Sequence, residues 1–398
     1  MSKILIALLV LAALNGFVIW RLIDRWPRAR HHALATWLMA GAFFLLQLVG
    51  PFGDHLFFPE LKKHLDMGGL ITVIDWLSYG GLGILSCVFV YTMAADVIGI
   101  TWKTVAMPAH PVDFNRRTLL TLGLTTLCTT ALGIHQAVAG PEVRRVEIPL
   151  DNLPEGFDGF KIAQISDLHA GPIIGREYTE NVVKIANSLN ADIIVLTGDF
   201  VDGSVADLRE EVACLAGLEA PLGKFFVTGN HEYYWGAAQW MDEFRMLGLR
   251  VLRNEHEVLG RHGQEIVLAG ITDYSTRNMP PGEASNPRQA VAGAPADRLK
   301  ILLAHQPASY RTAHEAGFDL LLSGHTHAGQ YFPFSCFIGL FQRYYKGLNK
   351  HENMWIYVNS GTGYWGPPLR TGNPTEITLI SLRPAGAPEV SSARGAAA

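Results

Sequence analysis

The sequence predicts an α/β globular domain preceded by about four membrane-spanning helices. Of its 398 residues, 49% are hydrophobic and only 17% are charged, well below the roughly 25% of charged residues usual in soluble domains. Residues 1–141 hold 10 Lys and Arg against 7 Asp and Glu, whereas the remainder holds 22 against 29. From Phe160 onward, short apolar runs alternate with helical patterns. We therefore expect a membrane region at 1–141, a globular domain at 142–383 and a disordered tail at 384–398.

The composition also excludes several classes of protein. The length and the apolar content exclude a disordered chain, a collagen and a disulfide-stapled miniprotein. The acidic balance of the globular half argues against nucleic acid as a partner, because phosphate backbones bind basic surfaces. Cys87 and Cys128 lie in apolar runs, so only Cys214 and Cys336 remain in the globular half, and no disulfide framework is predicted.

Four long uncharged stretches predict the membrane helices, since each approaches or reaches the ~20 residues needed to cross a bilayer. They are Ile4–Trp20, Ala33–Gly53, Trp76–Ala95 and Thr118–Ile134. The first stretch could instead be the core of a signal peptide, but it lacks a small-residue cleavage site and more spans follow. The fourth is rich in Thr, and its alternative is a buried helix of a soluble domain. Because a membrane span need not be purely aliphatic, we expect four spans.

The basic residues between these spans predict which side the globular domain lies on. Seven flank the first and third connections: Arg21, Arg25, Arg28, Arg30, Lys103, Arg116 and Arg117. Five lie on the opposite side: Lys3, Lys62, Lys63, Arg144 and Arg145. Since basic loops stay in the cytoplasm, we expect a multi-pass protein of the inner (plasma) membrane with an extracytoplasmic domain.

The segment Asn115–Leu120 points the same way. Its paired arginines precede an apolar run and resemble a twin-arginine export signal. Paired arginines before a span are also a common positive-inside anchor. Either interpretation leaves the following domain exported.

The globular half reads as alternating strands and helices. The predicted strands are Phe160–Ser166, Asp192–Thr197, Lys224–Thr228, Glu265–Gly270, Leu299–Ala304, Asp319–Ser323, Trp355–Asn359 and Thr375–Leu382. The predicted helices are Arg176–Leu189, Val205–Leu218, Ala237–Leu247 and Ser309–Ala316. The stretch Ser275–Arg298 is rich in Pro, Gly and Ala and is expected to be a surface loop. The early βαβα order implies a sheet with helices on its outer faces.

Polar residues follow most of these strands at the point where each strand ends. The clusters are Ser166–His169, Gly198–Asp199, Gly229–Glu232, Ala304–Pro307 and Ser323–His327. Alone, an Asp at a strand end often only caps a turn. In series they are hard to ascribe to capping, because the carboxyl ends of strands converge on one crevice. Oxygen and nitrogen donors without thiolate suit Mn, Fe, Zn or similar divalent ions.

These clusters resemble the calcineurin-like metallophosphoesterases, which include the purple acid phosphatases. The family pattern is Asp-x-His, Gly-Asp, Gly-Asn-His-Asp/Glu, a lone His and Gly-His-x-His, and it occurs here in order from Asp167 to His327. The closing Gly361–Gly363 and Arg370–Glu376 look like the membrane-attached, twin-arginine-exported bacterial branch. The resemblance implies a four-layer α/β/β/α sandwich. One departure is that four predicted spans precede the domain, where simpler members have one signal segment.

The resemblance also implies two metal ions and their ligands. Asp167, His169 and His327 would hold one ion, Asn230, His305 and His325 the other, and Asp199 would bridge them. Two such cations clamp a phosphate group and activate a water for attack on phosphorus.

One further histidine and two carboxylates adjoin these ligands. We assign His231 to the leaving oxygen, as proton donor or charge stabiliser, its alternative being a hydrogen bond to a ligand. Asp202 and Glu232 are candidates for supporting the ligands, although Asp202 could simply cap the helix starting near Val205.

The expected substrate is a phosphomonoester, phosphodiester or pyrophosphate, and a lipid-linked compound is one candidate. The aromatic segment Tyr331–Tyr345 directly follows the last ligand. It is either a hydrophobic flap packed on its own domain or a lip that meets lipid tails, where Arg343 and Lys346 could contact phosphate headgroups.

Two hypotheses of different class follow. The leading one is a phosphoesterase, and one resembling activity is hydrolysis of UDP-2,3-diacylglucosamine in lipid A synthesis, although that substrate is usually cytoplasmic. The other is a membrane transport or sensory protein with a non-catalytic metal-binding domain. We disfavour it because degenerate domains tend to lose ligands, and every ligand block is present.

Overall fold

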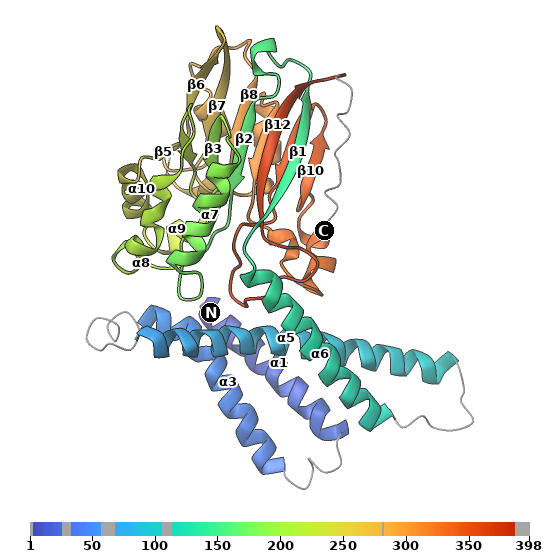
Figure 1. The fold of residues 1–398 in the computed structure, drawn as a ribbon. Helices are drawn as coiled ribbons and strands as arrows, with labels where there is room; N and C mark the ends of the chain where they lie inside the picture. The colour runs from blue at the N-terminus through green and yellow to red at the C-terminus, as the bar shows by residue number, and fades with distance from the viewer. Residues whose placement is uncertain (1–2, 26–32, 57–67, 106–113, 281, 387–398) are drawn as a thin grey trace.

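The computed structural model describes residues 3–25, 33–56, 68–105, 114–280 and 282–386 (Figure 1). The predicted disordered tail lies outside these residues from position 387 onward. The predicted tail begins at Pro384, but in the structure Pro384 is the last residue of a strand. That residue pairs with Leu150 at the sheet edge, so the regular structure runs slightly further than the composition suggests.

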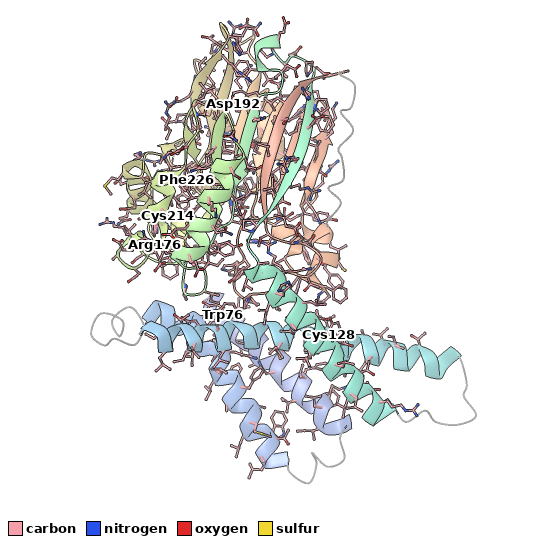
Figure 2. All side chains as sticks on the ribbon, in the orientation of Figure 1. Trp76, Cys128, Arg176, Asp192, Cys214 and Phe226 are labelled. Carbon is pink, nitrogen blue, oxygen red and sulfur yellow. The ribbon has the colours of Figure 1, made fainter. Side chains whose placement is uncertain are left out.

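Four helices at the N-terminal end are long and apolar enough to cross a membrane, as predicted. They are α1 (Lys3–Arg25), α3 (Ala33–Leu56), α5 (Gly68–Val105) and α6 (Phe114–Val138). Figure 1 shows α5 running beneath the globular part while α1, α3 and α6 extend away from it. With 38 residues, α5 is about 57 Å long at 1.5 Å per residue, nearly twice the thickness of a hydrocarbon core. Most side chains on these helices are apolar, as around Trp76 and Cys128 in Figure 2.

A few polar contacts fix these helices to one another. The Asn15 side chain donates to Gln47 Oε1 (2.9 Å), and Gln47 donates to the carbonyl of Gly81 (3.3 Å), which joins α1, α3 and α5. Arg21 and Asp96 form an ion pair between α1 and α5. Such bonds matter in an apolar surrounding, because no water competes for the polar groups.

The globular part contains two six-stranded sheets. The first has the order β1 (Glu142–Leu150), β12 (Glu376–Pro384), β2 (Lys161–Ile165), β3 (Ile193–Leu196), β4 (Lys224–Phe226) and β5 (Arg250–Val251). The second has the order β10 (Gly347–His351), β11 (Met354–Val358), β9 (Leu320–Ser323), β8 (Lys300–Leu303), β7 (Gln264–Gly270) and β6 (Glu255–Arg261). Strands β2 to β5 are parallel, as are β7, β8, β9 and β11, so each sheet carries several strand ends to one edge.

The layers follow from where the apolar side chains lie. Between the sheets, Ile162 and Phe225 of the first face Leu268 and Leu303 of the second in one buried core. Helices α7 (Arg176–Ser188), α8 (Val205–Val212) and α10 (Ala237–Met246) cover the outer face of the first sheet. Helices α11 (Pro287–Ala290) and α12 (Tyr310–Glu315) cover that of the second. The four-layer α/β/β/α architecture is thereby confirmed.

All eight predicted strands are present, but four strands were not predicted: β1, β5, β6 and β10. Strands β1 and β6 lie at sheet edges, where alternate side chains face water, so their apolar runs are broken by charges. The predicted helix Val205–Leu218 ends at Val212 and continues as a 3₁₀ turn over Ala213–Gly217. The expected loop Ser275–Arg298 contains α11 and part of the 3₁₀ turn Tyr274–Asn278.

The globular part is seated directly on the membrane helices. Leu369 packs into a buried cluster with Cys87 of α5 and Tyr331, against Ile134 of α6. The backbone N–H of Arg370 donates to the carbonyl of Gly133 in α6 (2.9 Å). The hydroxyl groups of Ser86 and Tyr331 lie 3.0 Å apart. Both polar and apolar contacts therefore tie the two halves together.

Candidate metal centre

The candidate ligands come from the carboxyl ends of five strands belonging to both sheets. Asp167, Asp199 and Asn230 follow β2, β3 and β4, while His305 and His325 follow β8 and β9. Five of the seven candidates adopt left-handed backbone conformations: Asp167 (φ 53°), His169 (53°), Asp199 (55°), His325 (72°) and His327 (48°). Residues other than glycine rarely do so, and such strain clusters at functional sites.

Glycine allows the chain to approach itself closely at this edge. A Cβ on Gly324 would lie 2.0 Å from Ser166 Oγ, and one on Gly229 would lie 2.2 Å from Asp199 Oδ1. Neither separation is possible for real atoms, so any side chain would displace Asp167 or Asp199. The glycines of the Gly-His and Gly-Asn pairs are therefore required by the packing of the ligands.

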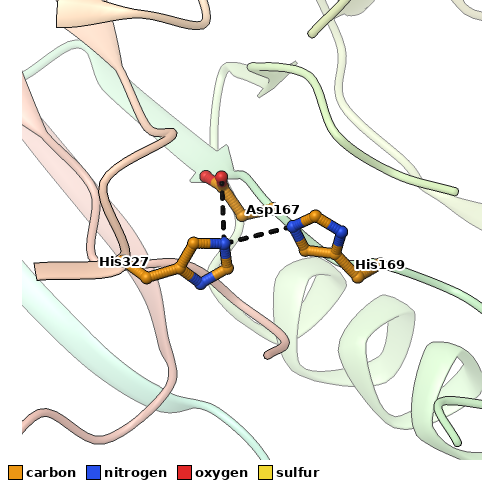
Figure 3. Close-up of side chains that lie close together, drawn as sticks. All are labelled: Asp167, His169 and His327. Atoms are coloured by element: carbon orange, nitrogen blue, oxygen red, sulfur yellow. Dashed lines mark hydrogen bonds and ion pairs between the residues drawn. The ribbon is translucent and has the colours of Figure 1, made fainter. Parts of the chain in front are cut away.

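The first group of candidate ligands joins Asp167, His169 and His327 (Figure 3). His169 Nε2 lies 3.1 Å from His327 Nε2, which lies 3.4 Å from Asp167 Oδ1. All three side chains are buried. Asp167 is held by Ser166, whose hydroxyl donates to Oδ2 (2.5 Å), and by the backbone N–H of His325 (2.9 Å to Oδ1).

The second group joins Asp199, His305 and His325. His305 Nε2 lies 2.9 Å from Asp199 Oδ2 and 3.2 Å from His325 Nδ1. His305 Nδ1 donates to the carbonyl of Thr197 (2.8 Å), which directs its Nε2 lone pair into the site. Asn230 adjoins this group, because the next backbone N–H, that of His231, donates to Asp199 Oδ1 (2.8 Å). Asn230 Oδ1 is buried and has no hydrogen-bond partner within the described ranges.

Asp202 connects the first group to His231. Its carboxylate lies 3.2 Å from His169 Nδ1 and 2.5 Å from His231 Nδ1. Both imidazoles thus have an acceptor behind them, which leaves each Nε2 directed toward the site. Ser204, not Asp202, occupies the N-cap position of α8, so the alternative capping role of Asp202 is not seen. Of the two interpretations, the structure favours support of the site.

Glu232 is fully buried behind the turns that carry Asp199 and Asn230. Its carboxylate accepts from the backbone N–H groups of Gly229 (2.6 Å) and Phe200 (2.7 Å). Burial and the nearby Asp199 raise the pKa of Glu232 to about 7. Glu232 therefore holds the two ligand-bearing turns together through these hydrogen bonds.

The charges of the site are strongly coupled. Burial would raise the pKa of Asp199, but His305 and His231 hold it well below its usual value. Burial and the neighbouring His305 lower the pKa of His325 to about 3. Burial would likewise favour neutral His231, but Asp202 and Asp199 raise its pKa to about 9. His231, supported by Asp202, is therefore an imidazole that can carry a proton, while His325 stays neutral.

Arg370 is a candidate functional residue to which the sequence analysis assigned no role. Its guanidinium is completely buried, and Nη2 lies 2.8 Å from His327 Nδ1. Nη1 donates to the carbonyls of Ser360 (2.6 Å) and His327 (3.2 Å). Burial and this positive charge hold the pKa of His327 well below its usual value. Neutral imidazole is the form that binds metals.

The donor set fits divalent cations. Carboxylate oxygens and imidazole nitrogens converge within 4.8 Å of one another in each group, and neither group includes a cysteine. The partnerless Asn230 Oδ1 is an oxygen donor of the kind a cation would satisfy. Buried like charges at this density need compensation, which cations supply.

The aromatic segment Tyr331–Tyr345 partly satisfies both sequence interpretations. Tyr331 and Tyr344 are buried on the domain, as in a flap. Ile338 and Tyr345 are partly buried, and five large apolar side chains are exposed, namely Phe332, Phe334, Phe337, Leu340 and Phe341. Lys346 donates to Asn373 Oδ1, and Arg343 lies over the Tyr344 ring (5.5 Å), so both cations already have partners.

Comparison with known proteins agrees with this geometry. A family model described as calcineurin-like phosphoesterase matches residues 160–329. A "transmembrane protein with metallophosphoesterase domain" from Bos taurus is 32% identical over 395 residues, covering 94% of this chain and 88% of its own. Its counterpart in Danio rerio is 37% identical and covers 68% of this chain and 63% of its own. An "uncharacterized metallophosphoesterase" from Helicobacter pylori is 37% identical and covers 63% of this chain and 66% of its own.

The fold and the site define a metal-dependent phosphoric ester hydrolase. The chain belongs to the calcineurin-like metallophosphoesterase family. The relatives include animal proteins, so the family likeness reaches beyond the bacterial branch suggested by the closing motifs. The chain spans somewhat less than two thirds of the Danio rerio relative but most of the Bos taurus one, and the alignment with the latter must include membrane helices.

Proposed function

We propose that the chain is a two-metal phosphoesterase that hydrolyses a phosphomonoester, phosphodiester or pyrophosphate bond next to the membrane. The observation that supports this most directly is the pair of adjoining buried groups, Asp167–His169–His327 and Asp199–His305–His325, with the unsatisfied Asn230 oxygen beside the second. Seven donors are too many for one ion. Asp199 would bridge the two groups: its Oδ2 lies 2.9 Å from His305 Nε2, and its backbone carbonyl accepts from the backbone N–H of His169 (3.1 Å).

The residues of the chain divide the chemistry between them. Divalent cations held by the seven donors would clamp the phosphate and activate a water. Asp202 holds His231 through Nδ1, so that Nε2 can give a proton to the oxygen that leaves phosphorus. Glu232 and Arg370 keep the ligand-bearing turns in place from behind. Water adds to phosphorus, the bond to the leaving oxygen breaks, and that oxygen takes up the proton.

We further propose that the catalytic domain faces the extracytoplasmic side of the inner membrane. Arg117 lies at the start of α6, whose 25 residues lead directly into the domain, so this basic end and the domain are about 37 Å apart along the helix. Asn115 to Arg117 lie at the start of α6, directly before its apolar run. This is where the basic residues of an export signal would have to lie. Both features are consistent with the basic ends lying in the cytoplasm.

Metal-dependent hydrolysis by the full chain tests the proposed function. The purified protein in detergent, stripped of metal and then supplied with Mn²⁺, should bind two ions and hydrolyse nitrophenyl phosphate or bis-nitrophenyl phosphate. We expect Asp199→Asn to lower kcat/KM by about 10²-fold or more, because Asp199 would hold the cations that stabilise charge at phosphorus. Asp242→Asn, on an exposed carboxylate of α10, is the matched control and should change little.

Two results would contradict the proposal. One is full turnover by Asp199→Asn at measured metal content. The other is a wild-type protein that binds metal but hydrolyses neither ester, which would support the transport or sensory alternative.

A further inference from the structure

The metal centre opens onto a cavity whose lining includes membrane helices. The cavity has a volume of about 590 Å³, within the range of about 300–1,000 Å³ found for small-molecule sites. Its polar residues are His169, Asp202 and His231. Pro51 of α3 and Tyr79 and Leu82 of α5 also line it. A larger depression of about 740 Å³ elsewhere on the domain includes none of the candidate ligands.

Apart from the metal centre, this cavity is apolar and aromatic. Tyr234 and Trp365 belong to the lining with exposed fractions of 66% and 54%. Their rings flank His231, with centroids 5.1 Å and 5.6 Å from that of the imidazole. Within the described chain, no Lys or Arg lines the cavity. Among the residues that the structure describes along this cavity, nothing beyond the metal centre would neutralise a polyphosphate, whereas a single phosphate attached to an apolar body matches the lining.

We propose that the substrate is a phosphate ester of a membrane lipid, with its phosphate at the metal centre and its hydrocarbon part along α3 and α5 beside Leu82. This inference rests on the proposed function and specifies its substrate class. The lipid remains partly in the bilayer while its ester is cleaved. Its apolar part therefore need not be transferred into water.

The surroundings of the cavity are suited to a bilayer. Leu77 of α5 and Val49 of α3 lie near its lining residues in sequence and are 55% and 38% exposed. Further along α5, Phe332 of the aromatic segment stacks on Tyr91, with ring centroids 6.1 Å apart. Beyond it, Leu340 and Phe341 are 79% and 81% exposed. Exposed aromatic side chains beside membrane helices are typical of the lipid–water interface, so this segment would hold the cavity at that level.

Substrate pairs that differ only in chain length test the inference. The diester pair is nitrophenyl hexadecyl phosphate and nitrophenyl methyl phosphate, and the monoester pair is hexadecyl phosphate and methyl phosphate. The full chain is assayed with Mn²⁺ in mixed micelles of a neutral detergent. We expect kcat/KM to be higher for the hexadecyl member of the pair that is hydrolysed.

A variant within the cavity separates recognition from simple partitioning into micelles. Leu82→Trp should lower the hexadecyl-to-methyl ratio of kcat/KM by about tenfold or more, as expected when an apolar contact surface is reshaped. Ile84→Trp places the same side chain on the same helix at a 39% exposed position outside the cavity and should keep the ratio. Leu82→Phe, a smaller change, serves if the tryptophan variant does not fold.

A second measurement needs no variant and no turnover. Hexadecyl phosphate carrying a diazirine at the chain end should crosslink to peptides of α3 or α5, and excess unlabelled hexadecyl phosphate should compete. Uncompeted labelling of lipid-facing positions would overturn the inference. So would a ratio that Leu82→Trp and Ile84→Trp leave equally unchanged. If neither member of either pair is hydrolysed while metal is bound, the proposed function itself fails.

Discussion

At the residue scale, the site is built from conformations that the chain would not adopt by itself. Left-handed backbone at Asp167, His169, Asp199 and two further ligands costs about 1–3 kcal/mol at each residue. Hydrogen bonds with buried neighbours hold these turns. The Glu232 carboxylate, for example, accepts from the N–H of Phe200 in the turn after β3 and from the N–H of Gly229 in the turn after β4. The ligands are therefore prearranged by the fold.

His231→Ala tests the leaving-group role. If His231 supplies a proton, the variant should keep both metals and lose about 10²–10⁴-fold in kcat, the usual contribution of general acid catalysis. The loss should be smaller for a nitrophenyl ester than for an alkyl phosphate, because a good leaving group needs little protonation. Kinetics on both substrates, with metal content determined on the same samples, provide the measurement.

An equal loss on both substrates would contradict the acid role of His231 and leave it with charge stabilisation. Falling metal content would instead show that it orients a ligand through Asp202, which lies 3.2 Å from His169 Nδ1. Asp242→Asn, on the exposed carboxylate of α10, is again the control and should change neither kcat nor metal content.

The same scale shows what the sequence could reveal about the site. The clusters that contain the seven candidate ligands could be located because each follows an apolar strand, and strand ends converge. The choice of the ligands within these clusters came from the family resemblance. Arg370 could not be assigned a role in this way. It lies 43 positions beyond His327, and only the three-dimensional path of the loop after β11 brings the two together. The supporting role of Asp202 was anticipated only as one of two alternatives.

At the element scale, the loop after β11 links the membrane helices to the metal centre. Leu369 packs between Gly83 of α5 and Gly133 of α6, and the next residue, Arg370, contacts His327. A movement of α5 against α6 would therefore displace Leu369, the residue next to Arg370, which contacts the candidate ligand His327.

Gly83→Val tests this link. A Cβ at Gly83 would lie 2.6 Å from Leu369 Cδ1, and such overpacking costs about 1–3 kcal/mol. We expect Leu369 and Arg370 to shift and the affinity for the more weakly held Mn²⁺ to fall, measured by titration of the metal-stripped full chain. Gly80→Val is the matched control, because nothing lies within 4 Å of a Cβ there. Equal affinities in the two variants would show that the loop is not sensitive to this contact.

Elements with strong periodicity were predictable, and weakly patterned ones were not. The buried strands β3, β8 and β9 are almost entirely apolar, and the buried part of β2 contains one polar residue, Gln164. The edge strand β1 mixes charged residues with apolar ones, and its contacts with β12 join residues 236 positions apart, such as Glu147 and Arg383. Sequence patterns within short windows cannot show such a partner.

At the scale of the whole molecule, the membrane region determines on which side of the membrane the globular domain lies. We predict that a reporter fused after Ala398 is exposed outside the cytoplasm, because the basic ends of α1 and α6 are expected to stay inside. Alkaline phosphatase, which is active only outside, and green fluorescent protein, which is fluorescent inside, give opposite readouts. Activity of the cytoplasmic reporter would contradict this orientation and favour UDP-2,3-diacylglucosamine as substrate.

The position of β12 has a consequence for how the chain is made. Strand β1 follows α6 immediately but pairs only with β12, which also separates it from β2. During synthesis, all four apolar helices emerge long before β12, so the first sheet must wait with a gap between β1 and β2. The domain thus completes its fold only after the membrane segments have been made. A ribosome that stalls before Glu376 would leave an anchored, unfinished sheet with open edges, the kind of intermediate that quality-control proteases and chaperones must handle at the membrane.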